Sequence, residues 1–374
     1  MLKIGILGGG QLGQMFLQNA FSYPFQLFSL DPDPQAPCAS FHKNFRQGAL
    51  QDYSTVFEFG KYLDVITIEI ENVNTQALKD LERIGKKVYP QPHIIELIAD
   101  KRLQKEFFKE NNFPTADFIS IENASDIPKH LTFLPAFQKL AKGGYDGKGV
   151  QRLENAQDLN KAFEGASLLE KKVTIIKEIA VIVARNQKNT AVYDPVEMVF
   201  DEKLNLVDYL LAPATLSPSQ TETAKKLAIS LIEKLEMVGI LAVEMFVDEK
   251  GDILLNELAP RPHNSGHHSI EACYTSQYDQ HLRAITNLPL GNTQMRYPFV
   301  GMLNIIGAEG YQGEAHYEGL EKVLALEKVY IHLYNKSMTK AGRKMGHFTI
   351  LGKNKAEIEE KMQSLKENFR VIHH

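Results

Sequence analysis

The length and charge of the chain limit its function before any motif is considered. Its 374 residues are enough for two or three domains with hydrophobic cores of their own. The 42 Lys and Arg residues nearly balance 46 Asp and Glu residues, for a formal charge of -4, so we expect no partner nucleic acid and no anionic membrane. No apolar run is long enough to span a bilayer and no signal pattern opens the chain, so we expect a cytoplasmic protein.

The first hundred residues alternate between strand and helix patterns. This alternation is typical of an α/β domain with a parallel sheet. A charged helix pattern then runs to a cluster of helix-breaking residues at 111–115, and we place a domain boundary near residue 100. The elements predicted in this part are strands at 3–7, 25–31 and 65–71 and helices at 11–20 and 100–110.

A glycine motif follows the first strand. Residues 8–13 read G-x-G-x-x-G at the start of a helix, and Asp31 ends the second strand, as in the fingerprint of dinucleotide-binding enzymes. Amides at a helix N-terminus bind phosphate of any kind, so the motif indicates an anion more securely than it indicates NAD. A dehydrogenase remains one hypothesis, and a glycine turn that serves only strand-to-helix packing is another.

A second glycine-rich segment, 142–150, predicts a loop that wraps a triphosphate with its amides. It is not a Walker loop, because the Gly-Lys pair is followed by Gly. Lys148 adds a point charge, and Lys139 lies on an apolar strand pattern at 134–140, where an inward-facing ammonium needs an anionic partner. The next strand pattern suits a hinge that offers backbone groups to adenine, and Glu178 then offers a carboxylate to the ribose.

An amphipathic helix at 221–235 precedes two strand patterns, 240–247 and 253–257, joined by a turn at 249–252. A four-residue turn places Glu244 opposite Glu257. Like charges directly across a strand pair destabilise it, so two facing carboxylates indicate a cation between them, and Mg²⁺ bound to a nucleotide's phosphates fits. The alternative is a solvated hairpin edge with unpaired acids.

Two further segments carry polar groups at high density. Residues 256–267 combine a carboxylate, amides, a guanidinium, imidazoles and a hydroxyl at a strand exit. After residue 291 a smaller strand-rich tail contains the segment 336–347, with four cations and two glycines. Such a cluster favours an anion site, and because the chain is not basic overall, one mononucleotide suits it better than a polymer.

Together, segments 8–15, 143–149, 178–185, 256–267 and 336–347 resemble the N5-carboxyaminoimidazole ribonucleotide synthetase family of ATP-grasp ligases. The resemblance implies an α/β and α+β chain: a Rossmann-like domain at 1–100, an ATP-grasp domain at 101–291 and a small C-terminal domain at 292–374. The implied enzyme is a homodimer that uses ATP and Mg²⁺ to join bicarbonate to 5-aminoimidazole ribonucleotide in purine biosynthesis. Carboxyphosphate is the implied intermediate.

The resemblance also implies the site residues. Glu244 and Glu257 are expected to hold Mg²⁺, Lys148 and Arg261 to neutralise the transferring phosphate, and His263, Asn264 and Ser265 to hold bicarbonate. The remaining ATP contacts are expected from Lys101, Lys139, Gly144, Tyr145, Asp146, Gly147, Lys148, Gly149, Val150, Glu170, Lys171, Lys172, Val173, Glu178, Asn256 and Glu257. The ribonucleotide contacts are expected from Gly10, Gln11, Leu12, Glu71, Tyr145, Asp146, Lys336, Arg343 and Lys344, with Lys336 also expected to act in catalysis.

The chain departs from the family pattern at three positions. Val150 stands where glutamine is usual, Lys142 where threonine is usual, and Phe200 where a histidine is often found near ATP, so we assign no nucleotide role to Phe200. The alignment leaves open whether Lys101 or Arg102 contacts ATP. Three alternatives stay in view: a related ATP-grasp enzyme that uses formate on a glycinamide ribonucleotide, a dehydrogenase, and a catalytically inactive nucleotide-binding regulator.

Overall fold

The N-terminal alternation of strands and helices folds into a parallel sheet. In the computed structural model, which describes residues 1–144, 149–201 and 206–373, this sheet has the strand order β3-β2-β1-β4-β5. Its strands are β1 (Lys3–Leu7), β2 (Gln26–Asp31), β3 (Phe45–Gln47), β4 (Val65–Ile68) and β5 (Lys87–Val88). The helices are α1 (Gln11–Ala20), α2 (Tyr53–Gly60) and α3 (Thr75–Arg83).

Local sequence explains where these helices begin. The side chain of Asp52 accepts a hydrogen bond from the Thr55 amide at the start of α2, and that of Asn74 accepts one from the Ala77 amide at the start of α3. The predicted strand at 65–71 is too long, because β4 ends at Ile68. Glu69 and Glu71 therefore lie in the turn that follows the strand.

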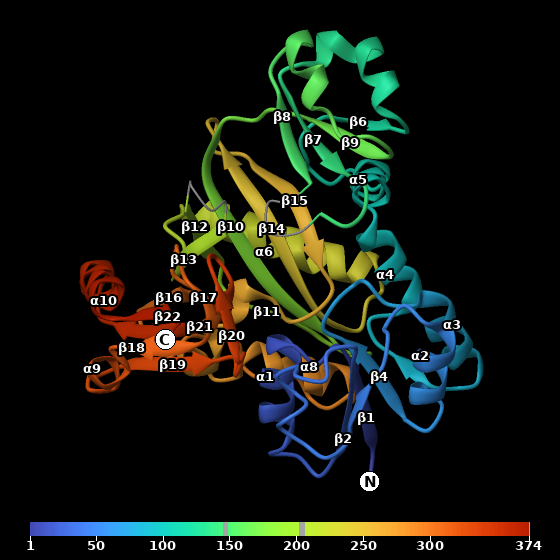
Figure 1. Cartoon of the computed structure of the whole chain (residues 1–374). Coiled ribbons are helices and arrows are strands. Elements are labelled where there is room, and N and C mark those ends of the chain that lie inside the picture. Colours follow the sequence, from blue (N-terminus) through green and yellow to red (C-terminus); the bar gives the residue numbers. More distant parts are fainter. Residues whose placement is uncertain (145–148, 202–205, 374) are drawn as a thin grey trace.

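A second, smaller sheet forms the lobe at the top of Figure 1. Its order is β6-β9-β7-β8 and all of its pairs are antiparallel. The strands are β6 (Phe118–Ile121), β7 (Ala136–Leu140), β8 (Val150–Leu153) and β9 (Ser167–Lys171), with 3-10 helices η1 (Ala124–Phe133) and η2 (Ala156–Lys161). Helices α4 (Pro92–Ala99) and α5 (Lys101–Glu110) connect the N-terminal part to this lobe. Asp100 caps α5 by accepting from the Arg102 amide.

A long antiparallel sheet runs through the centre of the molecule. In the described part of the chain its order is β15-β14-β10-β12-β13-β16-β21-β19, and β11 pairs with β10. The strands are β10 (Ile175–Arg185), β11 (Thr190–Val192), β12 (Val196–Asp201), β13 (Leu206–Ala212), β14 (Gly239–Asp248), β15 (Ile253–Ala259), β16 (Phe299–Ile306), β19 (Val329–Leu333) and β21 (Lys344–Gly352). The strands after residue 291 thus extend the sheet that carries the Glu244 hairpin.

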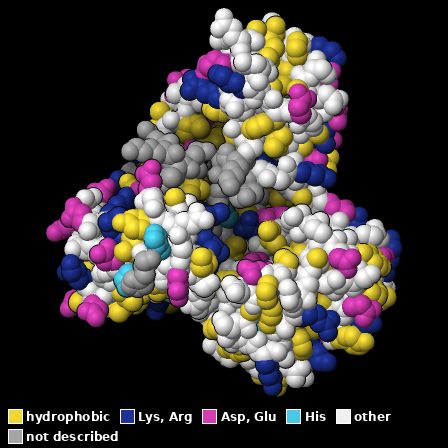
Figure 2. Space-filling model, in the orientation of Figure 1, with side chains coloured by type: hydrophobic (Ala, Val, Ile, Leu, Met, Phe, Trp, Pro, Cys, Tyr) yellow, Lys and Arg dark blue, Asp and Glu magenta, His cyan; other side chains and the backbone are white. Residues whose placement is uncertain are grey.

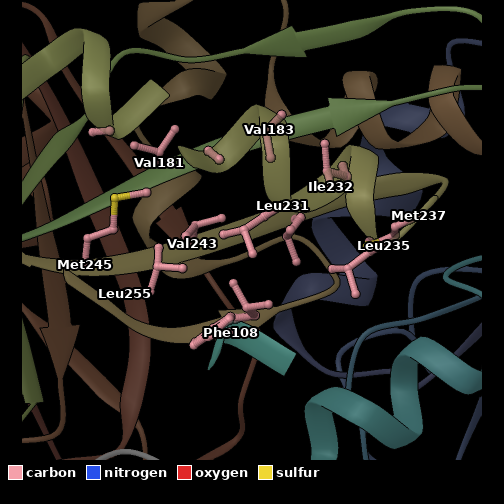
Figure 3. Close-up of a cluster of buried hydrophobic side chains, with 14 of the residues drawn as sticks. Phe108, Val181, Val183, Leu231, Ile232, Leu235, Met237, Val243, Met245 and Leu255 are labelled. Atoms are coloured by element: carbon pink, nitrogen blue, oxygen red, sulfur yellow. The ribbon is translucent and has the colours of Figure 1, made fainter. Parts of the chain in front are cut away.

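Helix α6 (Pro218–Lys234) covers one end of this sheet and begins three residues before the predicted start at 221. Ser217 and Gln220 form a capping box there, and Pro218 occupies the first turn. The apolar stripe of α6 packs on strands β10, β14 and β15 and on Phe108 of α5 (Figure 3). Leu231, Ile232, Val181 and Val243 are all fully buried in this core.

The remaining elements join the C-terminal part to the rest. Helix α8 (Gln277–Ile285) packs Tyr278 and Leu282 into the same core as Ile4 and Ile6 of the N-terminal sheet. Helix α10 (Lys355–Asn368) packs on β16 and β21. The other short elements are η3 (Asn264–Gly266), α7 (Ser269–Ala272), β17 (Gln312–Glu314) paired with β20 (Met338–Lys340), β18 (His316–Glu318) paired with β22 (Arg370–Ile372), and α9 (Leu320–Leu324). Within the described ranges no helix is long and apolar enough to cross a membrane.

Candidate active site

The predicted acidic pair lies on the hairpin formed by β14 and β15. Glu244 is directly opposite Glu257, as the sequence predicted, but the four-residue turn given as the reason is wrong. Val247 pairs with Ile253, and this register alone would place Glu244 opposite Asn256. A β-bulge between the Met245 and Glu244 pairs shifts the register by one residue and brings the two carboxylates face to face.

The electrostatics of this pair fit a divalent cation. Burial, together with the neighbouring charges of Glu257 and Glu178, raises the pKa of Glu244 to about 7, although Lys101 and Lys344 oppose the rise. Burial also raises the pKa of Glu178, on the adjacent strand β10. Lys101 Nζ lies 2.5 Å from Glu257 Oε1 and balances only part of this charge. Facing carboxylates beside an amide are the oxygen donors that Mg²⁺ accepts, with room left for phosphate oxygens and water. A ready-made group of three or more metal-ligating side chains is absent from the described residues.

The lysine predicted to need an anionic partner has one. Lys139 Nζ donates to Glu170 Oε1 at 2.7 Å and to Asn256 Oδ1 at 3.1 Å. Lys105 Nζ lies 2.5 Å from the other oxygen of Glu170, and both of these side chains are almost fully buried. Burial opposes ionisation of Glu170, but the two ammonium groups outweigh it and lower its pKa to about 2. Sequence reasoning missed Lys105, although it lies one helical turn after Lys101 on α5.

These residues line a cavity of about 10 Å³, and one of the two neighbouring cations Lys101 and Arg102 lies on its wall. Lys101 lines the cavity, whereas Arg102 donates to Asp100 at 3.0 Å and to Glu122 at 2.8 Å. The structure thus favours Lys101 over Arg102. The lining side chains are Lys101, Gln104, Lys105, Lys139, Leu168, Asn256 and Glu257.

Other predicted ATP residues lie around this cavity in the two sheets. Lys139 of β7 is paired with Val150 at the start of β8, and the Gly149 carbonyl accepts from the Leu140 amide at 2.8 Å. The side chain of Lys171 donates to the Phe133 carbonyl at 2.8 Å, and the exposed ammonium of Lys172 lies 3.7 Å from Glu154. Tyr145, Asp146, Gly147 and Lys148 lie outside the described residues, and the predictions made for them are not tested.

The segment after β15 presents neutral polar groups next to the acidic pair. The Ser265 amide donates to His263 Nδ1 at 3.3 Å, so the ring proton lies on Nε2, 3.6 Å from Glu244 Oε1. Burial lowers the pKa of His263 to about 3, helped by Arg261 and Lys344, so the imidazole is neutral and this contact is not an ion pair. Among the described residues, neither polar atom of the buried Asn264 side chain has a hydrogen-bond partner. A buried unpaired amide is costly and indicates a place for a ligand.

The N-terminal glycine motif and the C-terminal basic segment meet across the molecule. Lys336 Nζ donates to Gln11 Oε1 at 2.9 Å and to the Lys344 carbonyl at 2.7 Å. Arg261 Nε lies 2.9 Å from Glu71 Oε1. Lys and Arg side chains gather at the hollow between the lobes in Figure 2. Arg343 does not join these contacts, and its guanidinium donates instead to the Met338 carbonyl at 2.8 Å.

The comparisons with known proteins decide between the hypotheses. The chain matches the ribonucleotide synthetase preATP-grasp domain over residues 1–99, the ATP-grasp domain over 106–278 and the phosphoribosylaminoimidazole carboxylase C-terminal domain over 301–361. It is 33% identical to the N5-carboxyaminoimidazole ribonucleotide synthase of Synechococcus elongatus over 378 residues, covering 99% of this chain and 95% of that one. The chain belongs to the N5-carboxyaminoimidazole ribonucleotide synthase family.

Solved structures of the family agree with the whole fold. The N5-carboxyaminoimidazole ribonucleotide synthetase of Thermotoga maritima superposes with a TM-score of 0.92 at 40% identity, covering all of both chains. The Aspergillus clavatus synthase in complex with ADP and 5-aminoimidazole ribonucleotide gives 0.88 at 31% identity over 98% of each chain. The chain also spans 66% of the length of chloroplastic phosphoribosylaminoimidazole carboxylase from Vigna aconitifolia, at 34% identity over 372 residues and 97% of this chain.

Membership of the synthase family confirms the resemblance seen in the sequence and excludes the dehydrogenase alternative. The chain is an ATP-grasp ligase rather than a dehydrogenase, although its N-terminal sheet carries the dinucleotide fingerprint. His267 is fully buried, with its ring stacked on that of His347 at 4.6 Å, and so has a structural position. Phe200 packs against the core of β12 and β13, as an apolar residue should.

Proposed function

We propose that this chain uses ATP to join bicarbonate to 5-aminoimidazole ribonucleotide and releases N5-carboxyaminoimidazole ribonucleotide, ADP and phosphate. The observation that carries the proposal is the continuity of the segment 256–264. Asn256 and Glu257 at its start lie beside Lys139 and Lys101, and Asn264 at its end has an unpaired amide. One segment thus borders both the lysine-lined cavity, which would receive phosphate oxygens of ATP, and a place for a small polar ligand.

On the ATP side, the cations that line the cavity suit the phosphates. Lys101 is paired with Glu257 and Lys139 with Glu170, and Lys148 would add a third cation from the glycine-rich loop. Glu244 and Glu257 would hold Mg²⁺, with Glu178 nearby. When bound there, Mg²⁺ supplies neutralisation of phosphate charge, which is its usual role in phosphoryl transfer.

On the bicarbonate side, neutral donors suit a small anion. Asn264 Nδ2 and the Nε2–H of His263 would donate to bicarbonate, with Arg261 close by, and the Ser265 hydroxyl would hold the imidazole through His263 Nδ1 at 2.9 Å. A bicarbonate oxygen attacks the γ-phosphorus of ATP and ADP leaves, which gives carboxyphosphate. Carboxyphosphate breaks down to phosphate and CO₂, and the substrate amine adds to CO₂ and loses a proton to give the carbamate. Positioning and charge neutralisation supply most of the catalysis.

The ribonucleotide would lie between the N-terminal loop and the C-terminal basic segment. Lys336, Lys344 and Arg343 would bind its phosphate, and Glu71 would accept from a ribose hydroxyl or the base. Gly10, Gln11 and Leu12 would complete the pocket, with Tyr145 and Asp146 added from the glycine-rich loop. Closing that loop, 143–149, would keep water away from carboxyphosphate.

A coupled assay of ADP release tests the function directly. The protein with ATP, Mg²⁺, bicarbonate and 5-aminoimidazole ribonucleotide should release ADP in a ribonucleotide-dependent way and form the carboxylated product. Glycinamide ribonucleotide with formate should not replace the substrates. Release of ADP only with that second pair, or with neither pair, would contradict the proposal.

Two wider expectations belong to the same proposal. The protein would act in the cytoplasm, where the substrates of purine synthesis are found, and it would be a homodimer. Light scattering in solution measures the mass, and a value near that of one 42.2 kDa chain would contradict the dimer. The enzymatic proposal does not depend on that result.

A further inference from the structure

The amides of the N-terminal glycine motif are already bound to carboxylates of the chain itself. The Gly10 amide donates to Glu69 Oε1 at 2.7 Å, the Gly13 amide donates to Glu69 Oε2, and the Gly9 amide donates to Asp31 Oδ2 at 2.6 Å. In a dinucleotide-binding fold these amides face the pyrophosphate. Here the carboxylate of Glu69 occupies the position that the pyrophosphate takes in such folds.

The glycines of the motif are explained by the same carboxylate. A Cβ atom added at Gly8 would lie 2.2 Å from Glu69 Cγ, and one added at Gly10 would lie 2.4 Å from Glu69 Oε1. At Gly13 the added atom would lie 2.8 Å from the Gly8 carbonyl oxygen and 2.9 Å from Glu69 Oε2. A side chain at Gly8 or Gly10 would displace Glu69, so these two glycines leave room for its carboxylate.

Glu69 also links the two predicted halves of the ribonucleotide site. Gln11, which receives the Lys336 ammonium, lies between the two amides that Glu69 binds. Glu71, which pairs with Arg261, lies two residues after Glu69 in the turn that follows β4. A single partly buried carboxylate therefore fixes the backbone on both sides of the proposed pocket.

We propose that Glu69 is a positioning residue for the ribonucleotide, holding the first turn of α1 so that Gln11 meets Lys336 and Glu71 meets Arg261. This inference rests on the proposed function, because it assigns the pocket to 5-aminoimidazole ribonucleotide. Glu69 is not expected to touch the substrate. Its side chain is instead used up in hydrogen bonds to Gly10 and Gly13.

The variant Glu69→Gln tests this role while keeping the size of the side chain. A carboxamide has one acceptor oxygen, and its NH₂ group would face the second amide N–H, so one of the two hydrogen bonds is lost. We expect the KM for 5-aminoimidazole ribonucleotide to rise about tenfold, as for loss of one hydrogen bond to a charged group. The KM for ATP should stay within about twofold, because the ATP cavity lies on other elements. Glu82→Gln, an exposed change in the same domain, is the matched control.

Glu69→Asp provides a second test if the glutamine variant does not fold. It keeps both oxygens and the charge but shortens the reach by one methylene, and we expect a smaller rise in the same KM. A folded variant of either kind with unchanged KM for the ribonucleotide would overturn the positioning role. Equal rises in both KM values would also overturn it, because they would indicate general damage. An inactive wild-type protein would instead contradict the proposed function.

Discussion

Two acidic regions of this molecule have similar ionisation but opposite surroundings. Burial raises the pKa of Glu69 and that of Glu244 to about 7 each. Glu69 then receives hydrogen bonds from Gly10 and Gly13, which favour its charged form. Glu244 instead faces Glu257 and Glu178, which oppose its charged form, and only Lys101 and Lys344 counter them.

The two regions differ in whether the negative charge of the carboxylate is stabilised by neighbouring donors. A carboxylate that binds two amides has no need of a further partner, so the glycine motif cannot receive a second anion. Two acids held face to face by a strand register remain destabilised until a cation arrives. The molecule thus has a glycine motif whose amides bind its own carboxylates, and a hairpin in which Glu257 opposes the ionisation of Glu244.

Removing one of the facing acids should have the largest effect. Glu257→Gln is expected to lower kcat by at least about a hundredfold, equivalent to about 2.7 kcal/mol, since phosphate charge would lose its neutralising cation. Its melting temperature should not fall, because repulsion with Glu244 is relieved. Steady-state kinetics and thermal melting measure both effects. Glu249→Gln, in the exposed turn of the same hairpin, should change neither.

The buried lysine of the small lobe should affect ATP alone. Lys139→Met is expected to raise the KM for ATP by about tenfold, since a charge-assisted contact is lost, and to leave the KM for the ribonucleotide unchanged. It should also lower the melting temperature, because buried Glu170 would keep only Lys105 as a partner. Lys161→Met, which alters an exposed pair with Asp158, is the control. A change in ribonucleotide KM alone would mean that Lys139 is assigned to the wrong substrate.

The converse change lies in the C-terminal basic segment. Arg343→Ala is expected to raise the KM for 5-aminoimidazole ribonucleotide by about tenfold and to spare that for ATP. Its guanidinium would have to leave the Met338 carbonyl to reach the phosphate. Lys353→Ala, which removes one positive charge from an exposed residue just after β21, is the control. Weaker ATP binding with normal ribonucleotide binding would require a different placement of the substrate phosphate.

The titration of Glu69 should produce a smaller, pH-dependent effect on stability. Its folded pKa of about 7 lies above its ordinary value of 4.5. Between these values the unfolded chain releases the proton first, so the stability contributed by this group falls as the pH rises. Glu69→Gln lacks this loss, and its melting temperature relative to that of the wild type should increase by a few degrees from about pH 5 to about pH 8. A constant difference would mean that burial does not shift this pKa.

The filled glycine motif should give no signal at all with nicotinamide cofactors. Calorimetry should detect no binding of NAD or NADP in the micromolar range, because Glu69 and Asp31 already bind the amides. Stoichiometric binding of either cofactor would show that the carboxylates can be displaced. ATP is the positive control.

The fold was predictable wherever local pattern determines it. The parallel sheet, helix α1, helix α6 and the hairpin all follow from periodicity, caps and turn residues. Other features were hidden because they depend on contacts distant in sequence. Glu69 was read as part of a strand, and nothing local shows that β4 ends before it to reach Gly13. Counting turn residues also does not predict the β-bulge at Asn256, between the Met245 and Glu244 pairs.

The candidate site was predictable in its residue types more than in its pairings. The need of Lys139 for an anion was inferred from an apolar strand, and Glu170 meets it. The same reasoning applied to helix α5 would have identified Lys105, which lies on its buried face beside Phe108. The meeting of Gln11 with Lys336 could be expected only from the family resemblance, since 325 positions separate them.

The pairing of β13 with β16 has a consequence for protein engineering. The C-terminal segment continues the sheet of the Glu244 hairpin, so a chimera cut at residue 291 would strip β13 of its neighbour β16 and leave an open edge prone to aggregation. The lobe of β6 to β9 has a sheet to itself. Exchange of segments between related synthases is therefore better made at 115–173 than at the C-terminus. Recombination between their genes would favour the same crossover points.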